Sequence, residues 1–206
     1  MLYPSRLKQS GGSTGGTEVY IDGVKSSASR VDLDELIMIP VVKGSSGAIV
    51  FYNNEMHFLG SSLSPMTQHY KWDGSSWSSV STLPYKFFRG SAVVYNNEIH
   101  IFGGNYQLGV NTQHYKWDGS SWSSVSTLPY DIDACNVVVY NNEIHILGSE
   151  VEKTAHYKWN GSTWSSVSTL PYDFMYGSAV VYNNEIHILG GLSSNSTKHY
   201  KWNTCP

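Results

Sequence analysis

Short runs rich in apolar residues recur along this chain, and some of them alternate apolar and polar residues with the period of two that is typical of half-buried β-strands. In one representative stretch, residues 98–102 alternate in this way, residues 90–95 form an apolar run rich in β-branched residues, and residues 112–117 and 122–128 are two further runs. The pairs Asn96-Asn97 and Asp118-Gly119 lie between runs, and both favour tight hairpin turns. No segment shows the 3.6-residue period of an amphipathic helix. The pattern therefore predicts units of four short antiparallel strands.

This four-strand pattern occurs four times. One marker, Tyr-Asn-Asn-Glu, begins at Tyr52, Tyr95, Tyr140 and Tyr182. A second marker, His-Tyr-Lys-Trp, begins at His69, His114, His156 and His199. Repeats of about 40 residues are typical of solenoids and propellers. Four antiparallel strands per repeat favour the blades of a β-propeller, in which only short strand edges remain.

The units resemble the kelch family. Each has an apolar first strand, a second strand that ends in glycine, and in three units a Tyr and a Trp seven positions apart: Tyr70 and Trp77, Tyr115 and Trp122, Tyr157 and Trp164. The resemblance covers residues 33–206 and implies an all-β, kelch-like propeller of four blades with four antiparallel strands each. The double glycine of the family is retained only at Gly103-Gly104 and Gly190-Gly191, because Gly60 and Gly148 are followed by serine.

The last strand of the fourth blade is expected to come from the N-terminal side of the chain. The apolar pattern of Leu33, Leu36 and Ile39, followed by Pro40, matches that of a fourth strand in the first unit. We therefore predict that an N-terminal strand closes the ring and removes an unpaired sheet edge. The alternative is a strand-swapped dimer that forms a larger ring.

Residues 1–32 form an N-terminal arm outside the repeat. Residues 11–16 have the composition of a flexible Gly/Ser linker, and residues 17–25 predict a small hairpin that turns at Asp22-Gly23. A hairpin of two strands is barely stable alone, so we expect the arm to attach to the propeller or to another protein, including a second copy in a homo-oligomer. A disordered leader is the alternative.

Composition narrows the class of partner. The net charge is −3 and the 13 Lys and Arg residues are scattered, so we expect no binding to nucleic acid. We also expect no membrane insertion, since neither a secretory signal nor an apolar run of about 18 residues is present. Cys135 and Cys205 are too few for a zinc cage and are expected to be free thiols.

The eight histidines all belong to the repeat, and two interpretations compete. Histidine is a common metal ligand, and each second-strand histidine follows a turn glutamate. A residue that occurs in every blade more simply serves packing between blades, and we expect no metal and no cofactor. The seven tryptophans are periodic in the same way and are expected in core or rim packing. No catalytic motif is present, so we do not expect an enzyme.

The copies differ mainly on one face of the predicted ring. Chain direction alternates, so the second-to-third and fourth-to-first loops share a face, and these loops vary while the hairpin turns opposite hardly change. Loops on a rigid scaffold commonly carry binding sites. The predicted ligand-binding residues are Phe87, Phe88, Arg89, Tyr106, Asp131, Asp133, Phe174 and Tyr176.

These features favour a non-enzymatic recognition propeller. The units resemble those in kelch-like tail or fibre proteins of bacteriophages and prophages of Gram-positive bacteria. That resemblance implies a virion component that binds a host cell-surface glycan, as in host-receptor binding, or another virion protein. An intracellular adaptor for protein–protein interaction, located in the cytoplasm, is the alternative, and a sugar-processing enzyme is a third.

Overall fold

The computed structural model describes residues 20–21, 24–25, 46–104, 112–191 and 197–203. The chain divides into two units, residues 1–39 and 40–206, and each is considered by itself. In the first unit, β1 (Tyr20–Ile21) pairs antiparallel with β2 (Val24–Lys25). Both strands lie within residues 17–25, for which the sequence predicts a small hairpin.

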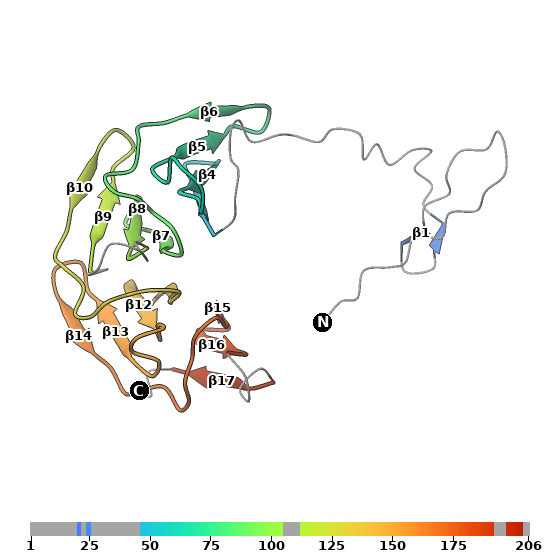
Figure 1. Ribbon diagram of the computed structural model, residues 1–206. Helices are drawn as coiled ribbons and strands as arrows, with labels where there is room; N and C mark the ends of the chain where they lie inside the picture. The colour runs from blue at the N-terminus through green and yellow to red at the C-terminus, as the bar shows by residue number, and fades with distance from the viewer. Residues whose placement is uncertain (1–19, 22–23, 26–45, 105–111, 192–196, 204–206) are drawn as a thin grey trace. The chain divides into compact units, whose positions relative to one another are not determined.

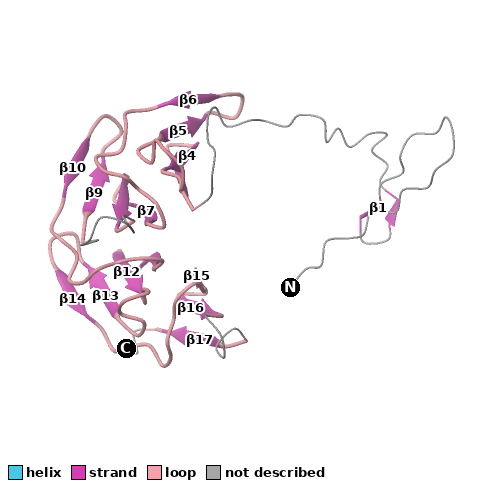
Figure 2. Ribbon diagram, in the orientation of Figure 1, coloured by secondary structure: helices cyan, strands magenta, loops and turns pink. Residues whose placement is uncertain are grey.

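The described part of the second unit is all-β, with strands joined by loops (Figure 2). Blade 1 contains β3 (Ala48–Tyr52), β4 (Glu55–Leu59), β5 (His69–Trp72) and β6 (Trp77–Ser79). Blade 2 contains β7 (Ser91–Tyr95), β8 (Glu98–Phe102), β9 (His114–Trp117) and β10 (Trp122–Ser124). Blade 3 contains β11 (Asn136–Tyr140), β12 (Glu143–Leu147), β13 (His156–Trp159) and β14 (Trp164–Ser166). Blade 4 contains β15 (Ser178–Tyr182), β16 (Glu185–Leu189) and β17 (His199–Trp202).

These sheets are the blades of a four-bladed β-propeller, as predicted. Within each blade the strands follow one another in chain order and pair antiparallel. Neighbouring blades contact each other through their first strands, β3 with β7, β7 with β11, and β11 with β15. Figure 1 shows the blades following one another around a curve from β4 to β16.

Blade 4 has three strands among the described residues, and β17 is the outermost of these three. The predicted closing strand, residues 33–40, lies outside the described residues. Closure of the ring by this strand, and the strand-swapped alternative, therefore stay predictions.

The hairpin turns repeat with little change, as their sequences do. Each Asn-Asn pair between a first and a second strand has both residues in the left-handed region, with φ between 48° and 64°. Asparagine tolerates this region better than most residues, which explains its use in these two-residue turns. In the turn between β5 and β6, the Asp73 carboxylate accepts hydrogen bonds at 2.8 Å from the backbone N–H of Ser75 and of Ser76. Asp118 and Asn160 cap the corresponding turns of blades 2 and 3.

The glutamates of these turns are paired across the sheet. In blade 1 the Lys71 Nζ lies 2.9 Å from a carboxylate oxygen of Glu55. The same pairing occurs in the other blades, between Glu98 and Lys116, Glu143 and Lys158, and Glu185 and Lys201. This turn face is thus a repeated structural surface.

Histidines contribute to the packing within and between blades. In every blade the second-strand and third-strand histidines are hydrogen bonded, Nδ1 to Nε2, at 2.8 Å. His114 also meets the edge of Trp159 in the next blade, with ring centroids 5.5 Å apart. Burial lowers the pKa of His114 to about 3, so its ring is neutral. Among the described residues, no group of three or more His, Cys, Asp or Glu side chains is arranged to hold a metal ion.

Two further features of the described residues bear on the sequence-based expectations. No segment of the described residues forms a helix long and apolar enough to cross a membrane. Cys135 is a buried free thiol, and burial raises its pKa to about 12. Cys205 lies outside the described residues.

Candidate functional site

The residue two positions before each first strand adopts an unusual backbone conformation in all four blades. These equivalent residues, six positions before each marker tyrosine, have positive φ values: Ser46 (66°), Arg89 (62°), Ala134 (54°) and Tyr176 (57°). Residues other than glycine adopt this left-handed backbone conformation only at a cost in free energy, and residues in such conformations cluster at binding and active sites. The repeat therefore holds one strained residue per blade at the start of its inner strand.

Close packing beneath these positions explains the local turn. Glycine follows the strained residue in three blades, and a Cβ at Gly90 would lie 2.3 Å from the buried ring of Phe87. A Cβ at Gly177 would lie 2.2 Å from the ring of Phe174. The buried phenylalanine thus fills the space below the chain. Of the residues before the two glycines, Tyr176 is half-exposed and the Arg89 side chain is 17% exposed.

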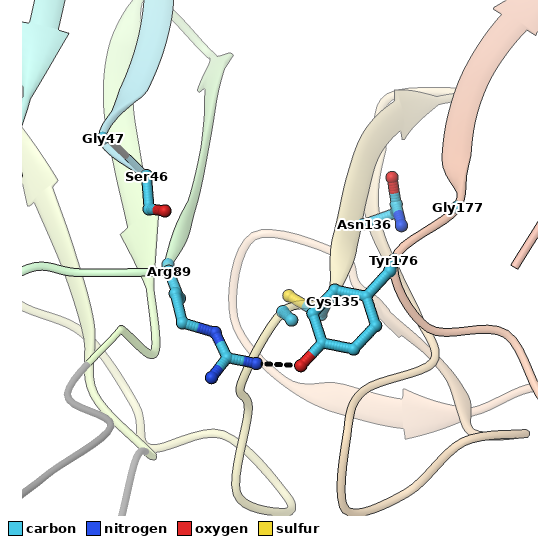
Figure 3. A pocket seen from close by; sticks show the side chains of 9 residues that line it. Ser46, Gly47, Arg89, Cys135, Asn136, Tyr176 and Gly177 are labelled. Atoms are coloured by element: carbon cyan, nitrogen blue, oxygen red, sulfur yellow. Dashed lines mark hydrogen bonds between the residues drawn. The ribbon is translucent and has the colours of Figure 1, made fainter. Parts of the chain in front are cut away.

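All four blades contribute to one open hollow of about 290 Å³ on the variable loop face. Figure 3 shows its side chains, with Arg89 extending across toward Tyr176. The hollow is lined by Ser46, Gly47, Arg89, Gly90, Ala134, Cys135, Asn136, Tyr176 and Gly177. Since each of these belongs to the start of a first strand, convergence of the blades creates the site.

Arg89 is the centre of a polar cluster in this hollow. Its Nε lies 3.2 Å from a carboxylate oxygen of Asp133, and its Nη2 lies 2.5 Å from Oε2 of Glu150. The same Nη2 donates a hydrogen bond to the Tyr176 hydroxyl, which in turn donates to Oε2 of Glu150 at 3.0 Å. The guanidinium also lies 5.4 Å from the centre of the Tyr176 ring. One cation beside blade 2 therefore links two carboxylates beside blade 3 and one phenol beside blade 4.

The two carboxyl groups differ in their environment. Burial raises the pKa of Asp133 to about 6, against the opposing effect of Arg89. The pKa of Glu150 is lowered, first by the hydrogen bond from Tyr176 and also by that from Arg89. Glu150 is thus ionised at neutral pH, whereas the pKa of Asp133 lies close to neutral pH.

The structure brings three of the predicted site residues together, namely Arg89, Asp133 and Tyr176. Phe88 is half-buried nearby, and its N–H donates to the Gly104 carbonyl at 2.7 Å. Asp131 is half-buried, and its carbonyl accepts a hydrogen bond from the Ser149 hydroxyl. Tyr106 lies outside the described residues.

The prediction that Phe87 and Phe174 contact a ligand is wrong. Phe87 and Phe174 are completely buried, so neither presents a surface to a ligand. They fill the same position in blades 2 and 4 that Ile132 fills in blade 3, beneath the strained residue. Their aromatic character, which suggested binding, serves the packing between blades.

Sequence reasoning missed Glu150 and the small residues around Arg89. Glu150 lies in the variable segment after β12, where the other copies have no acidic residue at the corresponding position. That difference is visible in the sequence. The contact of Glu150 with Arg89 is not, because the two residues belong to different blades. Ser46 and Ala134 could be found only by aligning the residue six positions before each marker tyrosine.

Comparison with known proteins supports the fold. No protein-family model matches the chain, and no curated protein matches its sequence. A solved structure described as "Structure of YjhT" superimposes with a TM-score of 0.63 at 12% sequence identity, covering 77% of this chain and 69% of that one. At this identity the likeness shows the fold alone, and the protein is accordingly a β-propeller.

Proposed function

We propose that this protein is a non-enzymatic recognition propeller that binds its ligand in the hollow around Arg89. The observation that carries the proposal is the convergence of one strained position from each of four blades, filled by a different side chain in each. Strain of this kind persists where the surrounding structure fixes it. The opposite face, by contrast, repeats the same turns and the same Glu–Lys pairs.

The chemistry of the hollow favours a glycan. Tyr176 has half of its surface exposed, and an exposed aromatic ring stacks on the apolar face of a sugar. The Glu150 side chain is 40% exposed and offers carboxylate oxygens that accept hydrogen bonds from sugar hydroxyls, while Arg89 holds Glu150 and the buried Asp133 in place. A few convergent polar groups on a rigid scaffold are typical of specific small-ligand sites.

The proposed setting is a virion. The repeat units resemble the kelch-like units of tail or fibre proteins from bacteriophages and prophages of Gram-positive bacteria, so the glycan would belong to the host cell surface. The N-terminal unit, with its β1–β2 hairpin, would attach the propeller to the particle. A second virion protein is the other partner that this setting allows.

Binding is favoured over catalysis by the state of the carboxyl groups. Both Asp133 and Glu150 contact the same guanidinium, and Glu150 also accepts from Tyr176. These contacts engage the two groups in holding the site together. We therefore propose recognition rather than sugar processing.

A glycan array, followed by titration of the selected glycan, tests the proposal. The Phe88→Ala, Tyr176→Ala double variant should bind at least about tenfold more weakly, which corresponds to about 1.4 kcal/mol. Its melting temperature should fall only slightly, because Tyr176 is exposed and Phe88 is only half-buried. Ser120→Ala, in a turn on the opposite face, is the matched control and should bind normally. Loss of binding in the control, with retention in the double variant, would place the site on the other face.

A further inference from the structure

Each blade has two packing faces, which differ in composition. The trailing face packs onto the next blade and is formed in blade 1 by Val50, Tyr52 and Leu59. The leading face receives the previous blade and is formed in blade 2 by Ile99, Ile101 and Trp117. The same two faces meet between blades 2 and 3 and between blades 3 and 4. Three internal junctions therefore define one repeated interface.

The trailing face of blade 4 has the same residue types but is exposed. The marker tyrosine of this face is 5%, 4% and 3% exposed at Tyr52, Tyr95 and Tyr140, but Tyr182 is 62% exposed. The second-strand residue Leu147 of blade 3 is 1% exposed, whereas its counterpart Leu189 is 41% exposed. Val180 is exposed beside them. Among the described residues, no further blade covers this face.

The leading face of blade 1 is the missing half. Ile49 and Phe51 are 55% and 75% exposed, although their counterparts in blade 2, Ala92 and Val94, pack against blade 1. The turn between β5 and β6 shows the same vacancy. A Cβ at Gly119 would lie 3.0 Å from the Tyr52 hydroxyl of the preceding blade, whereas a Cβ at Gly74 would meet nothing within 4 Å.

The internal junctions also fix how far each blade turns relative to the last. At each one, the third-strand histidine meets the edge of the next blade's tryptophan, with centroids 5.4, 5.5 and 4.8 Å apart. Blade 4 offers an exposed His199 for this contact, and blade 1 offers a partly exposed Trp72. In this structure both end faces are exposed, so these two residues do not meet within one chain.

We propose that the trailing face of blade 4 docks onto the leading face of blade 1 in a second copy of this chain. Tyr182 then reaches Gly74 of the second copy, and His199 meets its Trp72, as in the internal junctions. Blade 4 of the second copy docks in the same way onto blade 1 of the first, so two chains related by twofold symmetry close one ring. Residues 33–40 lead directly into blade 1, so in this ring the predicted N-terminal strand of one chain would complete blade 4 of the second copy.

This inference is independent of the proposed glycan site, which lies within one chain. Its test is the mass in solution, measured by light scattering on a sizing column over a concentration series. The intact chain should have twice its 22.9 kDa mass. A single-chain mass, or a series of larger species, would overturn the two-chain ring.

Two variants identify the faces. Phe51→Asp places a charge on the leading face and Val180→Asp places one on the trailing face, and both positions are exposed in the single chain. Each variant alone should have the single-chain mass, because every junction then contains one charged face. Leu63→Asp, at an exposed apolar residue outside both faces, should keep the doubled mass.

A mixture of the two variants gives the decisive result. Phe51→Asp keeps an intact trailing face and Val180→Asp keeps an intact leading face, so an equimolar mixture should recover the doubled mass through one unaltered junction. A mixture that keeps the single-chain mass would overturn the head-to-tail contact. Circular dichroism of each variant separates this outcome from misfolding, since the charges lie on surfaces and should leave the strand signal unchanged.

Discussion

The Arg89 guanidinium donates a hydrogen bond to the Tyr176 hydroxyl, although the two residues are 87 positions apart. Arg89 precedes the first strand of blade 2 and Tyr176 precedes that of blade 4, at the same position of the repeat. Two identical backbone environments thus present different side chains to each other across the hollow. The contact therefore depends on the packing of blade 3 between blades 2 and 4.

Asp133, the carboxylate beside Arg89, should give the site a pH dependence near neutrality. Its pKa is about 6 in the folded protein and 3.8 is its ordinary value, so the folded state holds the extra proton between these values. Its contribution to stability is therefore present at low pH and lost as the pH rises through about 6. Asp133→Asn cannot titrate, so the melting temperature of this variant, relative to the original chain, should rise between pH 4 and pH 7. A constant or falling difference would show that pairing with Arg89 outweighs burial.

The buried histidines should have the opposite effect. Burial lowers the pKa of His69, His114 and His156 to about 3, below the ordinary value of 6.5. The unfolded chain then binds more protons between these values, so stability is highest above pH 6.5 and is lost as the pH falls toward 3.

Thermal melts of the intact chain from pH 7 to pH 4.5 measure this loss. In the His100→Gln, His114→Gln variant one hydrogen-bonded pair no longer titrates, and the melting temperature should depend less steeply on pH. An unchanged slope would mean that carboxyl groups, rather than these rings, govern acid unfolding.

The Asn-Asn turns should tolerate glycine but not alanine. Asn97 has a φ of 59°, a conformation that costs a residue with an ordinary Cβ about 1 kcal/mol or more. Asn97→Ala should therefore lower the melting temperature by about 2 to 4 °C in a chain of this size. Asn97→Gly, which adopts this φ freely, should melt close to the original chain. Equal melting temperatures for the two variants would argue against strain at this turn.

Residues 33–40 should complete blade 4 along the edge of β17. If Leu36 and Ile39 are buried there, each contributes about 1.5 to 3 kcal/mol before entropy is subtracted. Leu36→Asp and Ile39→Asp should lower the melting temperature strongly, and deletion of residues 1–40 should cause unfolding or aggregation. Asp34→Ala, a polar position in the same segment, is the control and should change little. A deletion variant that melts like the intact chain would exclude closure by this strand.

Much of the architecture was decided locally and could be predicted from the sequence. Alternation of apolar and polar residues specifies strands, and the Asn-Asn pairs specify the turns between them, because both effects act over a few neighbouring residues. Four nearly identical units then imply four nearly identical blades. The variable loops were visible for the same reason, as departures from the repeat.

Only the tertiary structure decided which of these residues face a partner. Phe87 and Phe88 are adjacent and chemically identical, but one lies beneath Gly90 in the core and the other is half-buried at the surface. Tyr140 and Tyr182 have the same immediate neighbours and differ only because a further blade covers the first of them. Burial and ion pairing between Arg89, Asp133 and Glu150 arise from contacts between blades that are far apart in the chain, and no local pattern encodes such contacts.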